Sequence, residues 1–204
     1  MAKNIFRNFK KNMISNNISF GAKFLSSSTI QKYDRAKNIF VDKGVSLVQF
    51  EPQNRSDKLA IKIANNKWGR YFIGQSIYLC ADMLSKKEAS KEVNKILMLT
   101  EQTDNFKKLD ATKILALAQT QQNKNLPMEL KWLQVDPKFQ YLNDGRTIKH
   151  VGKAIVDTLK NIYDELILDS SPNSKRFYIK QGFELVDDIN ARFLWKKVTI
   201  CRVV

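Results

Sequence analysis

The sequence predicts an α/β fold on a mixed β-sheet, and three observations lead to that prediction. Strand-like and helix-like patterns alternate in the second half of the chain, in the order strand, helix, strand, helix, strand. Hydrophobic residues make up 43% of the 204 residues, which is enough to build a packed core. The longest uncharged, apolar-leaning stretch, residues 71–81, is far shorter than the ~20 residues that a membrane-spanning helix needs.

In the first half, short local patterns predict the elements. Residues 33–40 fit a short helix. Apolar and polar side chains alternate over residues 45–50 and again over residues 58–64, as they do in half-buried strands. A turn at residues 52–55 would join these two strands into a hairpin.

Residues 68–80 fit either a strand or irregular structure. A further helix is predicted after them, beginning at Ser85. The aromatic residues within 68–80 fit a buried core better than a base-stacking surface. The predicted helix begins with a capping box formed by Ser85 and Glu88. Its apolar face continues at Val93, Ile96, Leu97 and Thr100.

The second half begins with a predicted hairpin. Composition leaves residues 112–121 open between helix and strand, but a polar turn at 123–125 and an alternating segment at 128–135 favour two paired strands. A helix is expected after the loop at 143–145. Its apolar stripe consists of Val151, Ala154, Ile155, Leu159 and Ile162.

Four further elements complete the predicted fold. Residues 166–168 are consecutively apolar, which is typical of a strand in the middle of a sheet. A second helix at 174–181 ends at Gly182, in the left-handed cap position. Strands at 183–186 and 192–198 follow.

Charge and composition narrow the classes of function. The net charge is +15, and residues 1–43 carry nine basic residues against only Asp34 and Asp42. A positive field of this kind attracts polyanions such as nucleic acid, although it does not by itself name a partner. With two cysteines and the single histidine His150, the chain has neither a disulfide framework nor a two-histidine zinc site.

We expect two parts in the chain: a basic N-terminal extension or arm at residues 1–43, and a single domain at 44–204. The apolar residues Ile5, Phe6, Phe9 and Met13 recur at helical spacing among cations. This pattern favours an arm or a helix docked on the body of the protein. An organelle transit peptide is the alternative. With the arm interpretation, the expected location is cytoplasmic.

Three motifs in the second half carry a resemblance to a known family. They are Leu133-Gln134-Val135-Asp136-Pro137, Val151-Gly152-Lys153-Ala154-Ile155 and Phe177-Tyr178-Ile179-Lys180-Gln181-Gly182-Phe183. In this order and spacing, residues 113–197 resemble the acetyl-CoA half of a GCN5-related N-acetyltransferase (GNAT) domain. The resemblance implies a GNAT-like mixed, mostly antiparallel sheet flanked by helices.

Physical reasoning places an anion site at the start of the predicted helix. The first backbone N–H groups of a helix lack partners inside the helix, and the helix dipole is positive there. Arg146, Lys149 and Lys153 add positive charge. The resemblance implies that this loop binds the pyrophosphate of acetyl-CoA and that the preceding strand binds its pantetheine arm. The cofactor-binding residues implied in this way are Leu133, Val135, Arg146, Ile148, Lys149, His150, Val151, Gly152, Lys153 and Asn173.

The loop departs from the family pattern of Arg/Gln-x-x-Gly-x-Gly/Ala. Gly152 matches the last glycine, but His150 replaces the first. Thr147 occupies the Arg/Gln position, with Arg146 one residue early. A side chain at residue 150 hinders close approach of a phosphate, whereas helical backbone angles there would still direct the amide inward. For His150 itself, a helix-start residue without a catalytic role is favoured over a phosphate contact.

The resemblance also implies two catalytic residues. Tyr178 lies where the family places its general acid, which protonates the departing thiolate; packing of the helix onto the sheet is the alternative role. Glu129 lies where some members have a base, and strand alternation puts it on one side with Lys131, Leu133 and Val135. The alternatives are that Glu129 is a solvated carboxylate on a strand, or that a water relay leads to another residue. Asn173 and Ser174 resemble a family Asn-x-x-Ala segment or act as helix caps.

These observations lead to two hypotheses on function. The first is an acetyl-CoA-dependent N-acetyltransferase that acts on a primary amine, and the basic charge favours an acceptor attached to a polyanion or an acidic protein. The second is an inactive GNAT-like module that binds nucleic acid or a protein partner through its basic surface. Neither a homodimer nor a monomer is excluded, and no metal is expected.

Overall fold

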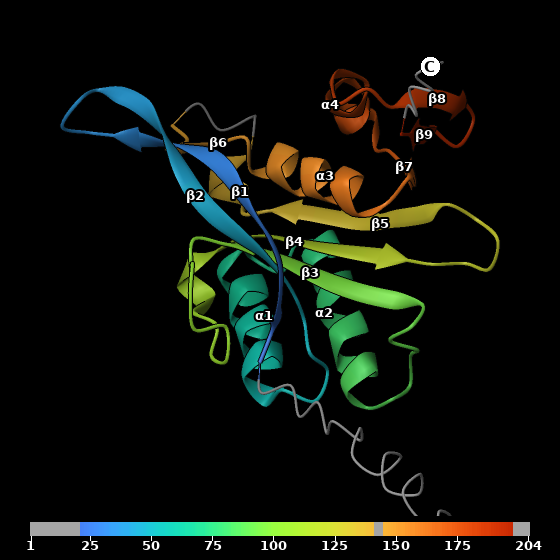
Figure 1. The fold of residues 1–204 in the computed structure, drawn as a ribbon, viewed down its shortest axis with the longest axis horizontal. Coiled ribbons are helices and arrows are strands. Elements are labelled where there is room, and N and C mark those ends of the chain that lie inside the picture. Colours follow the sequence, from blue (N-terminus) through green and yellow to red (C-terminus); the bar gives the residue numbers. More distant parts are fainter. Residues whose placement is uncertain (1–20, 141–144, 198–204) are drawn as a thin grey trace, which may run out of the picture.

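The computed structural model describes residues 21–140 and 145–197, and every strand in these ranges belongs to one mixed sheet (Figure 1). The strand order is β6-β1-β2-β3-β4-β5-β7-β9-β8. The strands are β1 (Lys23–Asp34), β2 (Ile39–Gln49), β3 (Asn94–Thr100), β4 (Ile114–Gln121), β5 (Met128–Val135), β6 (Ile148–Lys149), β7 (Glu165–Asp169), β8 (Glu184–Asp187) and β9 (Arg192–Lys196). The α-helices are α1 (Arg55–Lys67), α2 (Phe72–Ser85), α3 (Val151–Ile162) and α4 (Lys175–Lys180). None of these helices is long and apolar enough to cross a membrane.

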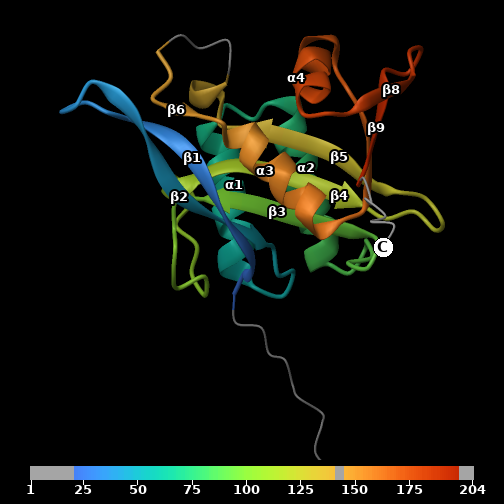
Figure 2. The same cartoon turned by 45° about the horizontal axis from the view of Figure 1, so that its top comes forward.

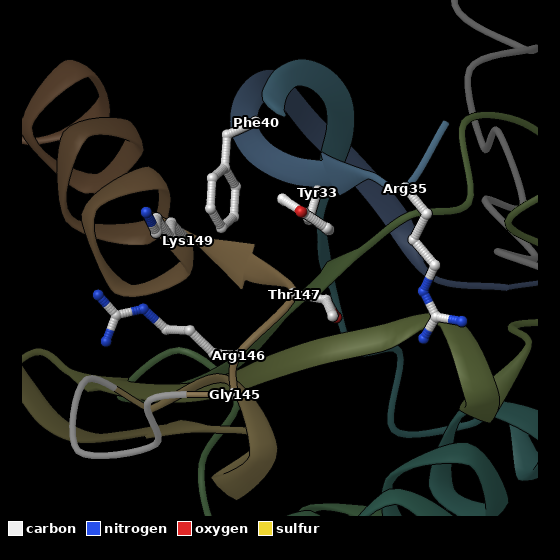
Figure 3. A pocket seen from close by; sticks show the side chains of 7 residues that line it. All are labelled: Tyr33, Arg35, Phe40, Gly145, Arg146, Thr147 and Lys149. Carbon is white, nitrogen blue, oxygen red and sulfur yellow. The ribbon is translucent and has the colours of Figure 1, made fainter. Parts of the chain in front are cut away.

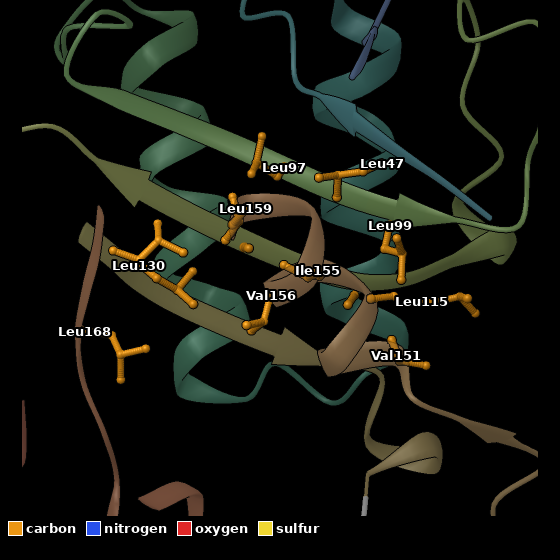
Figure 4. Close-up of a cluster of buried hydrophobic side chains, with 14 of the residues drawn as sticks. Leu47, Leu97, Leu99, Leu115, Leu130, Val151, Ile155, Val156, Leu159 and Leu168 are labelled. Atoms are coloured by element: carbon orange, nitrogen blue, oxygen red, sulfur yellow. The ribbon is translucent and has the colours of Figure 1, made fainter. Parts of the chain in front are cut away.

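Helices cover both faces of the sheet (Figures 1 and 2): α1 and α2 lie on one face, and α3 and α4 on the other. The core beneath α3 is formed by aliphatic side chains of the central strands and by Val151, Ile155 and Leu159 of the helix (Figure 4). A second core beneath α1 and α2 includes Ile61 and Ile77. The predicted α/β class and the mostly antiparallel sheet flanked by helices are confirmed.

Strands β5 and β7 are the one parallel pair of the described sheet, and their pairing is short. Met128 is opposite Leu166 and Glu129 is opposite Ile167, after which the ladder between the two strands ends. The rest of β5 remains paired with β4 on its other side, as far as Val135 opposite Ala116. The sheet therefore opens between β5 and β7 beyond Glu129.

The predicted helix at residues 33–40 is wrong. These residues form the end of β1, a turn and the start of β2, because the Asp34 carboxylate accepts the backbone N–H groups of Ala36 and Lys37, and Asn38 takes a positive φ of 56°. The boundary expected at residues 43 and 44 falls inside β2, so the sheet already includes part of the segment assigned to an extension. The remainder of the predicted arm, residues 1–20, lies outside the described residues.

The strand predicted at residues 58–64 is also wrong, because this segment lies within α1. The side chain of Asn54 caps the helix by accepting the N–H of Ser56 at 2.8 Å. Of the alternating residues, Ile61 is buried, whereas Leu59 and Ile63 are 55% and 43% exposed. Burial follows the helical spacing of Ala60, Ile61 and Ala64 instead of the strand alternation, so there is no hairpin here.

The predicted helix from Ser85 through Thr100 is wrong as well. Ser85 is the last residue of α2, and its hydroxyl donates to the carbonyl of Ala81. The segment 94–100 is β3, where Leu97 and Leu99 enter the core beneath α3, and Ile96 and Met98 enter the core beneath α1 and α2. A strand that is covered on both faces has apolar residues at consecutive positions. Its sequence therefore lacks the alternation of apolar and polar residues by which a strand is recognised.

The strand or irregular structure expected at residues 68–80 is wrong, because most of this segment lies in α2. Of its aromatic residues, Trp68 is buried as expected, whereas Tyr71 and Phe72 are 55% and 74% exposed. The remaining predicted elements are found within a few residues of their expected ends. They correspond to the second half of β2, to β4, β5, α3, β7 and α4, and to β8 and β9 within the described residues. Gly182 has a φ of 74°, which confirms the left-handed cap after α4.

Candidate active site

The edge of β5 that faces the opening presents backbone groups without strand partners. The Asp136 N–H donates to the Leu115 carbonyl at 2.9 Å. Hydrogen-bonded and non-hydrogen-bonded pairs alternate along an antiparallel ladder, so Leu133 and Val135 occupy non-hydrogen-bonded positions opposite β4. Their N–H and C=O groups therefore point away from β4, toward the opening. Two side-chain amides, those of Gln134 and Gln140, donate to the Val135 carbonyl at 2.7 and 3.4 Å.

A β-bulge in β5 changes the face on which Glu129 lies. The register shifts between Leu130, opposite Thr120, and Trp132, opposite Gln119, so Lys131 is the extra residue. Met128 and Leu130 lie in the core beneath α3, and after the bulge Leu133 and Val135 pack against that same core. The prediction that Glu129 shares a face with Leu133 and Val135 is wrong, because the bulge reverses the alternation between them.

Glu129 instead belongs to a charged cluster on the face of the sheet opposite α3. Its carboxylate is 3.1 Å from the Lys131 ammonium. On the neighbouring strands, Asp169 binds the Arg192 guanidinium with two contacts of 2.7 and 3.0 Å, and this pairing lowers the pKa of Asp169. Asp169 and Arg192 are 23 positions apart in the sequence and meet because β7 pairs with β9. No local pattern in the sequence indicates this ion pair.

His150 is the N-cap of α3 and has a left-handed backbone, with φ at 67° and ψ at 15°. The helical angles that would have directed the His150 amide inward are therefore not found. The His150 carbonyl accepts the N–H of Ala154 at 2.9 Å, which starts the helix. The N–H groups of residues 151–153 have no acceptor within the helix, as in any first turn.

Gly152 places the start of α3 at the mouth of the opening. A Cβ at this residue would lie 3.4 Å from the Phe177 ring of α4 and 3.8 Å from Val135 of β5. The first turn of α3, the end of β5 and α4 thus meet at a residue without a side chain.

The side chains predicted to contact phosphate point in different directions. Ile148 and Val151 are buried in the core beneath α3, so only their backbone is available to a ligand. The Lys153 ammonium pairs with Asp157 one turn along α3. Lys149 and Arg146 line a separate pocket beside the β1–β2 hairpin (Figure 3). The basic side chains of the loop therefore do not converge on the start of α3.

Tyr178 is packed among aromatic rings in the core beneath α3. Its ring centroid is 5.0 Å from that of Phe177 and 5.7 Å from that of Phe183. Burial raises the pKa of the phenol to about 12, because a phenolate is poorly solvated there. The phenol therefore keeps its proton at neutral pH, which suits either a proton donor or a packing residue.

The segment before α4 does not supply a side-chain cap. Asn173 is exposed in the short 3₁₀ turn at Pro172–Ser174, and Ser174 is the N-cap of α4 without a side-chain hydrogen bond to that helix. The Ser174 hydroxyl lies 2.8 Å from that of Ser171 instead. Neither Asn173 nor Ser174 therefore caps α4 through its side chain, as the alternative role required.

A cavity of about 430 Å³ lies at the C-terminal end of β5, where sequence reasoning expected only a strand end. Trp68 and Asp136 line it and are both nearly fully buried. Among the described residues, neither Trp68 Nε1 nor Asp136 Oδ2 has a hydrogen-bond partner, although the Lys138 ammonium is 3.6 Å from Asp136 Oδ2. The described residues include no cluster of three or more His, Cys, Asp or Glu that could hold a metal ion.

No protein-family model matches the sequence, and no curated protein matches it. Among solved structures, a chain from Desulfovibrio desulfuricans described as a GNAT-family acetyltransferase is 14% identical, with a TM-score of 0.47, and the match covers 74% of this chain and 98% of that chain. A GNAT-family acetyltransferase from Staphylococcus aureus is also 14% identical, with a TM-score of 0.44 and the same coverage of 74% and 98%. The spermidine/spermine N-acetyltransferase of Vibrio cholerae is 16% identical, with a TM-score of 0.41 and coverage of 74% and 92%. The solved structures that this chain resembles therefore include GNAT-family acetyltransferases.

Proposed function

We propose that this protein is an acetyl-CoA-dependent N-acetyltransferase that transfers an acetyl group to a primary amine. The observation that carries the proposal is the opening between β5 and β7, which has the first turn of α3 at its mouth. One edge of the opening consists of outward-facing peptide groups and one end consists of helix N–H groups. An extended ligand with amide groups and an anionic end fits this arrangement.

The backbone of β5 is the proposed binding site for the pantetheine arm. The N–H and C=O groups of Leu133 and the N–H of Val135 would pair with its amides as another strand does. The Val135 carbonyl already accepts the side-chain amides of Gln134 and Gln140. The N–H groups of residues 151–153 would bind the pyrophosphate, assisted by the helix dipole. Gly152 supports this fit, because it leaves the space between Val135 and Phe177 free of a side chain.

Two side chains are proposed to move protons during transfer. The amine nitrogen attacks the thioester carbonyl, the C–S bond breaks, and the sulfur takes up a proton. Tyr178, protonated at neutral pH, would donate that proton. Glu129 would accept the proton of the amine, directly or through water, from the face of the sheet opposite α3.

One observation favours a second candidate, an inactive module that binds nucleic acid or a protein partner. His150 places an imidazole beside the proposed phosphate site and holds a left-handed backbone that favours glycine. A loop of this kind is expected to bind phosphate less tightly than a glycine loop does.

Calorimetric titration of the full chain with acetyl-CoA, and separately with dephospho-CoA, tests the first candidate. One-to-one binding at micromolar concentration, with turnover of an amine panel lowered by Glu129→Gln, is the expected result. The Glu165→Gln variant is a matched control, because Glu165 also pairs with a lysine on the sheet. Absence of binding at millimolar acetyl-CoA would overturn the enzyme assignment and leave the inactive module.

A further inference from the structure

A second pocket, with a volume of about 500 Å³, lies at the end of the molecule that carries the β1–β2 hairpin (Figures 1 and 3). Strand β6 forms one wall by pairing with β1, with Gln31 opposite Lys149. The Tyr33 N–H donates to the Thr147 carbonyl at 2.8 Å and extends that pairing. Two distant parts of the chain, the hairpin and the segment before α3, thus build the pocket together.

The lining of this pocket is cationic and aromatic. Its charged members are Arg35, Arg146 and Lys149, and no carboxylate is among the described residues that line it. Figure 3 shows Arg146 and Lys149 on one side and Arg35 on the other, with Tyr33 and Thr147 between them.

Two of these charges are not neutralised by acids within the described structure. Arg35 and Lys149 form no ion pair there; the Lys149 ammonium lies 3.6 Å from the centroid of the Phe40 ring. Asp34, next to Arg35 in sequence, is engaged with the turn amides and lies 3.8 Å from Lys37. Holding cations together without acids costs electrostatic free energy, and an anionic ligand would offset that cost.

The pocket is separate from the proposed acetyl-CoA site. The hairpin lies at one end of the sheet and α4 lies near the other (Figure 1). Between them, the buried side chain of Ile148 fills the core beneath α3, and the opening between β5 and β7 lies on the α4 side of Gly152.

We propose that this pocket binds the phosphodiester backbone of a single-stranded nucleic acid. Cations on two sides of an aromatic and polar floor suit consecutive phosphates with a base between them better than they suit one small anion. This inference does not depend on acetyl transfer.

Fluorescence anisotropy of the full chain with a labelled single-stranded RNA, and with a DNA of the same sequence, tests the proposal over a salt series. Arg35→Gln and Lys149→Gln are each expected to weaken binding several-fold and to reduce the slope of log K against log salt by about 0.7, the value for one phosphate contact on a single strand. Lys62→Gln is the matched control, because it removes an exposed charge on α1 that does not line the pocket. This variant is expected to leave the slope unchanged.

Four results would overturn the proposal. The first is no binding of either nucleic acid. The second is equal losses for Lys62→Gln and the pocket variants, which would indicate only a general charge effect. The third is competition by inorganic phosphate as effective as that by unlabelled RNA at equal phosphate concentration, which would indicate a small-anion site. The fourth is loss of acetyl-CoA binding in Arg35→Gln, which would assign the pocket to the acetyl-CoA site.

Discussion

Gly152 in the first turn of α3 lies against the ring of Phe177 in α4, so closely that a Cβ at residue 152 would be 3.4 Å from the ring. The two helices approach each other here at the end of β5, and the sheet is open between β5 and β7. We expect this contact to limit the size of the proposed acetyl-CoA site, because a side chain longer than that of alanine at residue 152 would project between Val135 and Phe177.

Replacement of Gly152 tests that geometry. Gly152→Leu is expected to weaken acetyl-CoA binding by at least tenfold, because the added atoms project between Val135 and Phe177. Gly152→Ala is the matched control, since its Cβ contacts are at ordinary van der Waals distances and alanine favours a helix. Calorimetric titration measures both variants, and circular dichroism checks their folding. Equal affinity of the leucine variant and the native chain would contradict the proposed path of the ligand.

His150 is predicted to be a strained position that glycine relieves. A residue other than glycine at a φ of 67° costs roughly 1 kcal/mol, so His150→Gly is expected to keep or raise the free energy of unfolding and to tighten acetyl-CoA binding. His150→Asn is expected to fall between glycine and the β-branched His150→Val, which should destabilise the protein most. Urea unfolding of the three variants gives the order. A valine variant as stable as the glycine variant would show that no strain is present.

Tyr178→Phe separates the catalytic role of the phenol from its packing role. Removing the hydroxyl keeps the ring contacts, so the melting temperature should change little, whereas turnover should fall by about 10²-fold or more if the phenol protonates the leaving thiolate. Because burial raises the pKa of Tyr178 to about 12, any acetyl transfer by the native chain should not be lost through ionisation of this residue up to about pH 10. Unchanged turnover in the phenylalanine variant would leave Tyr178 as a core residue only.

Asp57 is predicted to make the fold less stable as the pH rises. It is fully buried near the start of α1; its Oδ2 accepts the Glu51 N–H at 3.2 Å, and its Oδ1 has no hydrogen-bond partner. Burial raises the pKa of this carboxyl from 3.8 to about 7. The folded state then binds the proton more tightly than the unfolded state, so the free energy of unfolding should fall between about pH 4 and about pH 7.

Asp57→Asn is expected to remove this part of the pH dependence and to stabilise the protein at pH values above about 7, since the amide keeps an acceptor for Glu51 without a charge. Urea unfolding over a pH series measures the effect, with the exposed Asp104→Asn as a control. A steeper loss of stability with pH in Asp57→Asn than in the native chain would reverse the assignment.

Local patterns in the sequence determined the second half of the fold. The apolar stripe that begins at Val151, the apolar run at 166–168 and Gly182 each have one favourable structure, because each pattern is satisfied by its immediate neighbours. In the first half, some local patterns fitted more than one structure. Residues 58–64 fit a strand by alternation and a helix by spacing, and only packing of α1 against the sheet decided between them.

The tertiary structure alone decided the details of the candidate site. One extra residue, Lys131, shifts the register of β5 and moves Glu129 to the face opposite Leu133 and Val135, which sequence alternation cannot show. The pairing of Asp169 with Arg192 and the pocket shared by Arg35 and Lys149 likewise depend on which strands become neighbours. Strand order is set by the burial of whole faces across the sheet, so residues far apart in sequence meet for reasons that no local pattern contains.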